Sequence, residues 1–169
     1  GQAEEQRGAG AAEEAVVIRS TVPPGTTEGL SRELHRDLYH NAEFLREKSA
    51  QEDFLTRPYA IIGHSSSPHY SVLARLREVY RTGGVTCHVT DSTTSELVKL
   101  LTNGHLATLI SFWNSAAAVS RRLEVNPYEV ARLVGLDPRV SPYGRVFLEL
   151  AYAGTCLPKD MAQLIKAAD

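Results

Sequence analysis

One long segment limits the folds open to this chain. From Thr93 to about Leu123 the sequence contains no proline, and Thr93–Glu96 at its start fits the capping box that opens many helices. A helix of about thirty residues is roughly 45 Å long, because each residue adds about 1.5 Å. A small domain cannot bury such a helix along its whole length. The segment therefore predicts a spine helix that connects two domains or two subunits.

The middle of the predicted spine helix is apolar on nearly every side, as expected for a helix covered by other elements or by a second subunit. Its apolar residues are Leu106, Leu109, Ile110, Phe112, Trp113 and Ala116–Ala118. Lys99 and Asn103 differ from them, because they are polar, four residues apart and on one helix face. Two donors at that spacing can hold a developing oxyanion, although a snorkelling lysine beside a helix-face amide is the commoner arrangement.

Short strands and helices alternate before the spine helix. Runs of β-branched and apolar residues predict strands over 15–20, 59–63 and 85–90. Helices are predicted after Thr26 or Thr27, either of which can cap the first turn, and from 67–68 to 83–84. The loop over 20–27 lies where open α/β sheets place ligand contacts, so Thr21 is either a turn hydroxyl or a site residue. Residues 1–14 are predicted to be a loose N-terminal segment.

Two carboxylates stand four residues apart in a further segment. If the chain is helical from Glu43 onward, Glu43 and Glu47 share a face and repel each other unless something binds between them. Two solvated carboxylates near a helix start, where the helix dipole favours them, are the simpler interpretation. The sequence alone leaves the pair open.

The last stretch of the chain combines a thiol, a cation and a carboxylate. Pro158 suits the first turn of a helix that runs to about Ala168, which places Cys156 at or just before the helix N-terminus. The partial charge of that terminus and the nearby Lys159 favour a thiolate, and Asp160 lies in the same turn. An isolated cysteine is nevertheless more often a small buried hydrophobe. A shorter helix is predicted between Asn126 and Gly135.

Composition excludes several classes of function. The chain has 169 residues, a net charge of −2 and no basic face or tail, which argues against nucleic acid or an anionic membrane as a partner. Its two cysteines, Cys87 and Cys156, are predicted to be free thiols in a reducing compartment. No apolar run approaches eighteen residues and no signal peptide is evident, so we expect a soluble, cytoplasmic protein. The histidines have no metal-ligand spacing, and no metal is expected.

Six motifs in order resemble the signatures of the UDP-glucose/GDP-mannose 6-dehydrogenases. They are 18–27 (IRSTVPPGTT), 41–47 (NAEFLRE), Glu96-x-x-Lys99-x-x-x-Asn103, 111–114 (SFWN), 135–138 (GLDP) and 154–160 (GTCLPKD). Six motifs in the same order are far more specific than any one of them. The resemblance covers residue 15 to the end and favours functional roles for Cys156, Lys99 and Asn103.

The resemblance implies an NAD-dependent, two-step oxidation of a nucleotide sugar at C6. Cys156 matches the cysteine that adds to the aldehyde formed first, giving a thiohemiacetal and then a thioester that water hydrolyses. By the same resemblance, Lys99 and Asn103 match donors to the oxyanion, and Asp160 and Thr21 match residues that hold or activate water. Glu43 and Glu47 match an acidic pair with base and hydrolytic roles. Phe44 and Leu45 match residues that line the sugar pocket. A nucleotide-sugar substrate and a homodimer through the spine helix follow from the same resemblance.

The expected architecture is α/β. Residues 15–91 are expected to form the C-terminal part of a Rossmann-like NAD domain, and residues 92–169 the long spine helix and an all-helical central region for dimerisation and substrate. The family's G-x-G-x-x-G turn has no equivalent in this sequence and the chain stops soon after Asp160, so we expect part of an enzyme, with its NAD-binding residues undetermined. Three positions depart from the family's pattern. Ala42 stands where the family usually has a proline, Ser115 stands in place of an acidic residue, and residues 148–153 take the place of a glycine-rich loop.

Two alternatives remain beside a partial dehydrogenase of UDP-glucose or GDP-mannose. One is a non-catalytic remnant that acts as a dimerisation or scaffold module through the spine helix. The other is a β-hydroxyacid-type dehydrogenase, which can share the Lys-x-x-x-Asn pattern but gives no reason for the residues around Cys156.

Overall fold

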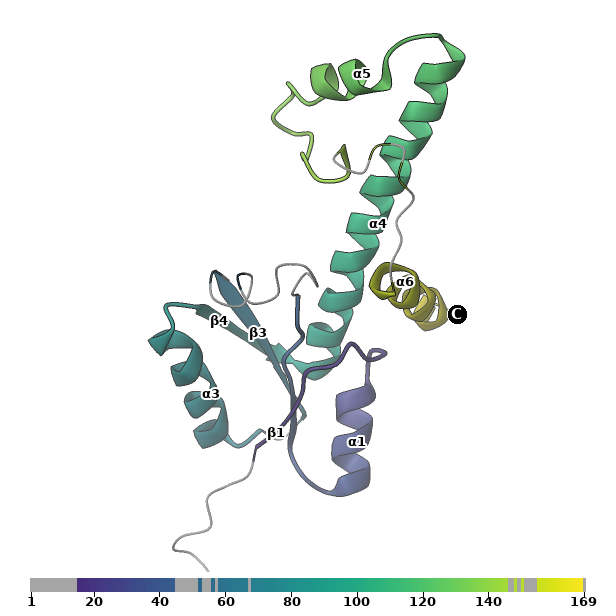
Figure 1. Cartoon of the computed structure of the whole chain (residues 1–169). Coiled ribbons are helices and arrows are strands. Elements are labelled where there is room, and N and C mark those ends of the chain that lie inside the picture. The colour runs from purple at the N-terminus through teal and green to yellow at the C-terminus, as the bar shows by residue number, and fades with distance from the viewer. Residues whose placement is uncertain are drawn as a thin grey trace, which may run out of the picture. The chain divides into compact units, whose positions relative to one another are not determined.

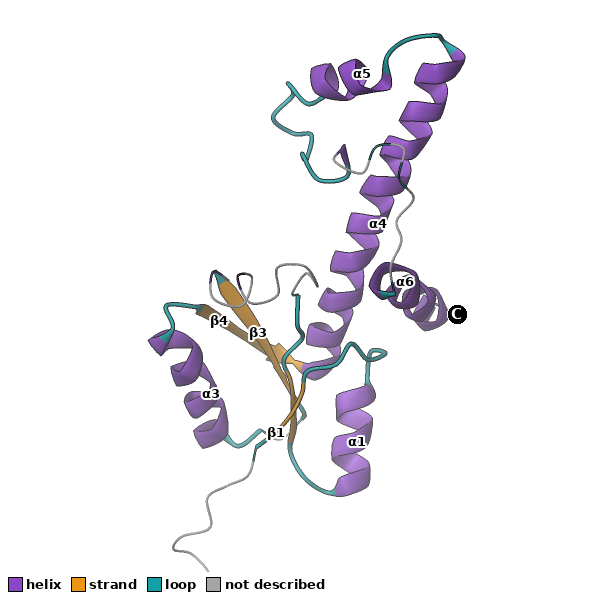
Figure 2. Ribbon diagram, in the orientation of Figure 1, coloured by secondary structure: helices purple, strands orange, loops and turns teal. Residues whose placement is uncertain are grey.

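The computed structural model describes residues 15–44, 52, 56, 58–66, 68–145, 148, 150 and 155–168. They form two compact units, one within residues 1–20 and 24–96 and the other within residues 21–23 and 97–169. The first is a mixed α/β unit, and the second is built from helices (Figures 1 and 2). The predicted α/β fold with a long helix is confirmed.

The sheet of the first unit has four strands in the order β1-β2-β3-β4. They are β1 (Val16–Ile18), β2 (Leu38–His40), β3 (Tyr59–His64) and β4 (Thr86–Asp91). β1 and β2 are parallel, β2 and β3 antiparallel, and β3 and β4 parallel. β2 was not predicted, because three residues are too few to show a strand pattern and only pairing with both neighbours makes this segment a strand.

Helices α1 (Thr26–Leu34) and α3 (Tyr70–Thr82) lie on opposite faces of this sheet (Figure 1). β2 is accordingly buried at all three positions, as expected for a strand covered on both faces. The core beneath α3 is formed by Tyr39, Ile62, Val72 and Leu73, with Tyr80 packed against it. α3 ends at the predicted glycine pair, and Gly84 adopts a positive φ of 71° that suits the turn out of the helix.

The N-terminus of α1 is capped from a distant part of the chain. We predicted a local cap by Thr26 or Thr27, and this prediction is wrong: Gly25, with φ of 89°, holds the cap position. The Glu96 side chain instead accepts the Gly25 N–H at 2.6 Å and the Thr27 N–H at 2.8 Å. A carboxylate satisfies these otherwise unpaired donors and complements the helix dipole better than a neutral hydroxyl.

The long helix α4 runs from Ser92 to Arg122, close to the predicted span. Its predicted capping box is wrong, since Asp91 Oδ1 accepts the Thr94 N–H at 2.8 Å and Asp91 Oδ2 accepts the Thr94 hydroxyl at 2.6 Å. Glu96, the expected capping-box partner, caps α1 instead. The described residues contain no helix long and apolar enough to span a membrane.

The second unit holds α4 from residue 97, α5 (Pro127–Val134) and α6 (Cys156–Ala168). α5 begins and ends as predicted: the Asn126 side chain accepts the Tyr128 N–H at 2.9 Å, and Gly135 closes the helix. α5 joins a core formed by Trp113, Ala117, Ala131 and Leu148. α6 comes close to α4 at Gly104, where a Cβ atom would lie 3.1 Å from the Leu164 side chain.

Candidate active site

Cys156 is the first residue of α6 and is exposed to solvent. This confirms the predicted location of the thiol at a helix N-terminus. Pro158 stands in the first turn, where its missing N–H breaks no helical hydrogen bond. The thiol is therefore accessible to a reactant, and the dipole of α6 favours negative charge at that point.

Asp160 lies one helical turn after Cys156, so the two side chains share a face of α6. Asp160 is 1% exposed, and its Oδ2 accepts a hydrogen bond from Asn103 Nδ2 at 2.5 Å. Lys159 Nζ lies 3.6 Å from the other oxygen, Oδ1, which has no hydrogen-bond partner among the described residues. Asp160 thus offers a buried acceptor beside the thiol-bearing turn.

Asn103 links this acceptor to the long helix. Lys99 precedes Asn103 by one turn on α4, and both side chains are buried. The Asn103–Asp160 hydrogen bond joins residues 57 positions apart in the sequence. The second unit therefore connects four predicted residues: Cys156 and Asp160 along α6, Asp160 and Asn103 by a hydrogen bond, and Asn103 and Lys99 along α4.

Thr21 also belongs to the second unit, although it follows a strand of the first. It lies in the loop between β1 and α1 and is half-buried. The structure therefore groups five of the predicted catalytic residues in one unit: Thr21, Lys99, Asn103, Cys156 and Asp160.

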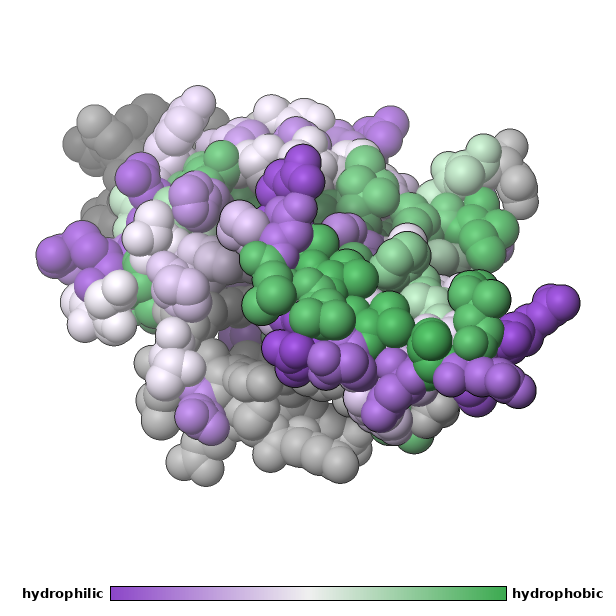
Figure 3. Space-filling view, turned by 90° about the horizontal axis from the view of Figure 1, so that it is seen from above, coloured by the Kyte–Doolittle hydropathy of each residue, from purple (hydrophilic) through white to green (hydrophobic). Residues whose placement is uncertain are grey.

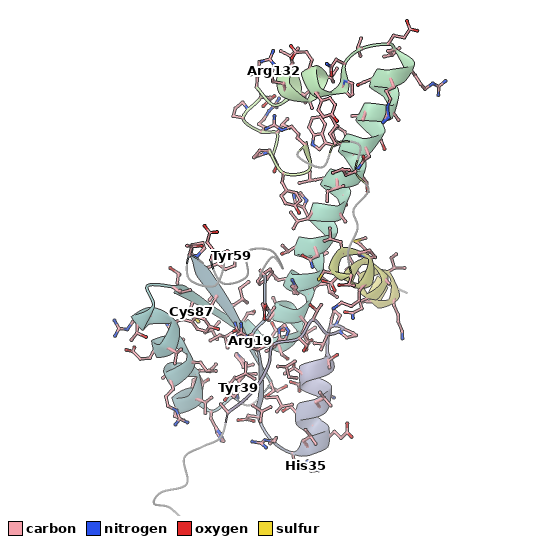
Figure 4. All side chains as sticks on the ribbon, viewed as in Figure 1. Arg19, His35, Tyr39, Tyr59, Cys87 and Arg132 are labelled. Atoms are coloured by element: carbon pink, nitrogen blue, oxygen red, sulfur yellow. The ribbon has the colours of Figure 1, made fainter. Side chains whose placement is uncertain are left out.

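Glu43 and Phe44 lie in the first unit, in an irregular segment after β2. The predicted helix does not start at Glu43. Glu43 Oε2 lies 4.0 Å from Arg19 Nη2, and both side chains are more than 40% exposed. The Phe44 ring meets Tyr59 edge-on, with centroids 6.2 Å apart (Figure 4 labels Arg19 and Tyr59). Leu45 and Glu47, the other predicted residues of this segment, lie outside the described residues.

Asn41 anchors the segment that carries Glu43. Its side chain is 3% exposed, and its Nδ2 donates to the Ile61 carbonyl at 2.7 Å. The Tyr80 hydroxyl donates to Asn41 Oδ1. Sequence reasoning assigned no role to Asn41 or Tyr80 individually, because their contact joins residues 39 positions apart and leaves no local pattern.

Glu96 and His40 are two further buried polar residues to which sequence reasoning assigned no functional role. Glu96 Oε1 also accepts the Thr27 hydroxyl at 2.6 Å, so one carboxylate serves three donors. His40 is fully buried, and its Nδ1 lies 2.8 Å from the Ser95 hydroxyl. Burial lowers the pKa of His40, while the Glu96 charge and the Ser20 backbone act in the opposite direction. The signal available in the sequence was Glu96 itself, the first residue of the Glu-x-x-Lys-x-x-x-Asn motif.

The capped terminus also limits where an anion can bind. Phosphate groups favour helix N-termini because unpaired N–H groups point at them. At α1 these donors already serve the Glu96 carboxylate, and a phosphate would meet a like charge there. The Glu96 charge therefore disfavours a dinucleotide pyrophosphate at the N-terminus of α1.

Comparison with protein families decides the identity of the chain. The model of the NAD binding domain of the UDP-glucose/GDP-mannose dehydrogenase family matches residues 6–83, and the model of the central domain of the same family matches residues 93–169. The chain belongs to the UDP-glucose/GDP-mannose dehydrogenase family. The resemblance inferred from the six motifs is thereby confirmed, and the family match supports NAD as the cofactor.

Individual members of the family agree with this assignment. The UDP-glucose 6-dehydrogenase of Rickettsia conorii is 38% identical over 156 residues, which are 88% of this chain and 35% of that protein. The UDP-glucose dehydrogenase of Pyrobaculum islandicum superposes with a TM-score of 0.79 at 37% identity, over 90% of this chain and 36% of that one. The UDP-D-ManNAc dehydrogenase of Pyrococcus horikoshii superposes with a TM-score of 0.74 at 30% identity, over 92% of this chain and 38% of that one. The chain thus spans little more than a third of these dehydrogenases.

Proposed function

We propose that this chain carries part of the catalytic machinery of an NAD-dependent nucleotide-sugar 6-dehydrogenase. The reaction would convert the C6 alcohol of UDP-glucose or GDP-mannose into a carboxylate. The observation that carries the proposal is the Asn103–Asp160 hydrogen bond, which connects the donors of α4 to the helix that begins with Cys156. Membership of the dehydrogenase family supports the reaction class.

The proposed chemistry has two oxidations and one hydrolysis. Each oxidation removes a hydride from C6, for which NAD supplies the acceptor when bound. After the first, the Cys156 thiolate adds to the aldehyde carbon and gives a thiohemiacetal; after the second, a thioester remains. Water then cleaves the C–S bond, releasing the carboxylate and restoring the thiol. Covalent capture keeps the reactive aldehyde bound between the two oxidations.

Lys99 and Asn103 are proposed to stabilise the oxyanion that forms when the thiolate adds. Both are donors, they lie one turn apart, and their burial strengthens electrostatic interactions with developing charge. Asp160 and Thr21 are proposed to hold or activate water. For Asp160, the Oδ1 atom supports this role, because it accepts no hydrogen bond from the residues that the structure describes.

The residues after β2 are proposed to serve the sugar. Glu43 and Glu47 would take the base and hydrolytic roles, and Phe44 and Leu45 would line the sugar pocket. For Phe44, the edge contact with Tyr59 supports a rigid aromatic wall. We assign residues 15–91 to the NAD domain and 92–169 to the spine helix and central region, in line with the family matches. Because the mechanism requires a reduced Cys156, we expect the protein to work in a reducing compartment such as the cytoplasm.

We also propose that two copies of the chain associate through the C-terminal half of α4. A groove of about 410 Å³ there is lined by Phe112, Ser115, Ala116, Val119, Ser120, Leu123, Val125 and Val130. Phe112, Val119 and Leu123 are each more than half exposed, and apolar side chains gather on the face seen in Figure 3. A second copy of the same helix would remove this apolar surface from water.

The same apolar surface favours the alternative of a dimerisation or scaffold module without catalysis. The two functions differ in their need for the thiol, since a scaffold makes no use of an exposed Cys156. Size-exclusion chromatography with light scattering tests the dimer directly: a monomeric wild-type chain would contradict it, and Leu123→Glu is expected to dissociate a dimer.

The deciding experiment for the enzyme is NADH production by the purified chain. UDP-glucose and GDP-mannose are supplied in turn with NAD, and Cys156→Ala is compared with Cys87→Ala, which removes the other free thiol from β4. We expect sugar-dependent NADH from both oxidations in the wild type and in Cys87→Ala, whereas Cys156→Ala should lose the NADH of the second oxidation, which needs the thiohemiacetal. An adduct on Cys156 in intact-mass spectra would identify the thioester. Absence of turnover and of NAD binding would favour the scaffold module.

A further inference from the structure

The segment that carries Glu43 owes its position to a side chain rather than to a regular element. Residues 41–44 follow β2 and belong to neither a strand nor a helix. The ion pair between Glu43 and Arg19 contributes little, because both side chains are exposed and the charged atoms are 4.0 Å apart. The place of the Glu43 carboxylate therefore depends on what holds the backbone beside it.

Asn41 holds that backbone through three of its polar groups. Its N–H donates to the Ile18 carbonyl at 2.9 Å, and its Nδ2 donates to the Ile61 carbonyl at 2.7 Å. These bonds tie the start of the segment to residues of β1 and β3, the strands on either side of β2. The third group, Oδ1, accepts the Tyr80 hydroxyl. Asn41 is 3% exposed, so water cannot readily replace a lost partner.

Tyr80 brings α3 into this arrangement. It stands in the last part of α3, and its ring packs against the core of Tyr39, Ile62, Val72 and Leu73. The ring is thus fixed by packing, and the hydroxyl is directed at Asn41. A hydroxyl on a packed ring is a more rigid donor than one on a free side chain, because little rotamer entropy remains to be lost.

We infer that Tyr80 is a positioning residue: through Asn41 it fixes residues 41–44 and with them the carboxylate of Glu43. The inference rests on the proposed catalytic role of Glu43. It extends that proposal to Tyr80 and assigns the sheet-covering helix α3 a part in the reaction.

The matched pair of variants is Tyr80→Phe and Tyr39→Phe. Each removes one tyrosine hydroxyl and leaves the ring in the same core, but the Tyr39 hydroxyl contacts the His69 backbone instead of Asn41. Amide hydrogen exchange on the full chain is the first measurement. We expect the backbone amide of Asn41, which donates to the Ile18 carbonyl, to exchange about five- to tenfold faster in Tyr80→Phe, the effect of one lost hydrogen bond. Its exchange rate should be unchanged in Tyr39→Phe. Equal protection in the two variants would overturn the inference.

Steady-state kinetics then separates positioning from general stability. Tyr80→Phe is expected to lower kcat by about tenfold while the KM for the nucleotide sugar changes less than twofold, because misplacing a reacting group affects the chemical step most. Tyr39→Phe should leave both constants unchanged. An Asn41→Ala background should abolish the effect of Tyr80→Phe, since the hydroxyl would have lost its target. Additive losses in the double variant would refute action through Asn41.

The exchange measurement keeps this inference distinct from the proposed function. If the chain shows no dehydrogenase activity, unchanged exchange in Tyr80→Phe would still overturn the anchoring of residues 41–44, and faster exchange would support it. If activity is present but both tyrosine variants lose it equally, Tyr80 has only a structural role and the inference fails.

Discussion

Replacing Glu96 with alanine should strongly destabilise the first unit. The side chain is 1% exposed and accepts three hydrogen bonds, from the N–H groups of Gly25 and Thr27 and from the Thr27 hydroxyl. Without the carboxylate, these donors have no acceptor in a site that water reaches poorly. Glu96→Ala also removes the charge that complements the dipole of α1.

The expected size of the loss follows from these contacts. A hydrogen bond to a charged group contributes about 1.5–3 kcal/mol, and a charge at a helix terminus adds about 0.3–1 kcal/mol. The contributions are not additive, because the three donors relax together once the carboxylate is gone. We therefore expect Glu96→Ala to lower the free energy of unfolding by about 3–5 kcal/mol, because three buried donors lose their acceptor at once.

Asp91→Ala is the matched control. Asp91 is also a carboxylate that caps a helix, but it is exposed; it accepts from Thr94 and, at 3.4 Å, from the Thr90 hydroxyl. Loss of such an exposed cap costs about 1 kcal/mol. Urea denaturation of both variants, followed by far-UV circular dichroism, measures the difference. If Glu96→Ala costs no more than Asp91→Ala, the reasoning from burial and donor count is wrong.

Two further predictions concern the same unit. Burial lowers the pKa of His40, so near the ordinary histidine pKa of about 6.5 the folded state binds fewer protons than the unfolded state. Acid therefore favours the unfolded state, and the free energy of unfolding should fall as the pH decreases from about 7.5 to about 5.5. His40→Gln should reduce that fall, as urea denaturation at each pH will show. Gly63→Ala should lower the thermal midpoint, with a loss of about 1–3 kcal/mol, because its Cβ would lie 2.7 Å from Ser92 Cα. Gly29→Ala, with no atom within 4 Å of the added Cβ, is its control in calorimetry, and an equal shift in both would contradict the argument.

Local signals in the sequence determined the ends and lengths of most elements. The capping-box pattern at 93–96 and the absence of proline to about residue 123 predicted α4 to within one residue at each end, although the cap itself is Asp91. Asn126 and Gly135 predicted α5, because an Asx cap and a terminating glycine act within one helical turn. Cys156 at the start of α6 and the shared face of Lys99 and Asn103 followed from the same short-range geometry, so the local part of the candidate site was predictable.

Tertiary structure decided the contacts between residues distant in sequence. β2 is a strand because its neighbours pair with it, and no pattern within three residues could show this. Glu96 fitted a local capping box but caps α1 across 69 to 71 positions, while Asp91 caps the start of α4. The bonds of Asn103 to Asp160 and of Tyr80 to Asn41 are of the same kind. Sequence periodicity reports which face of an element is buried, whereas only the packed fold determines which polar groups meet there.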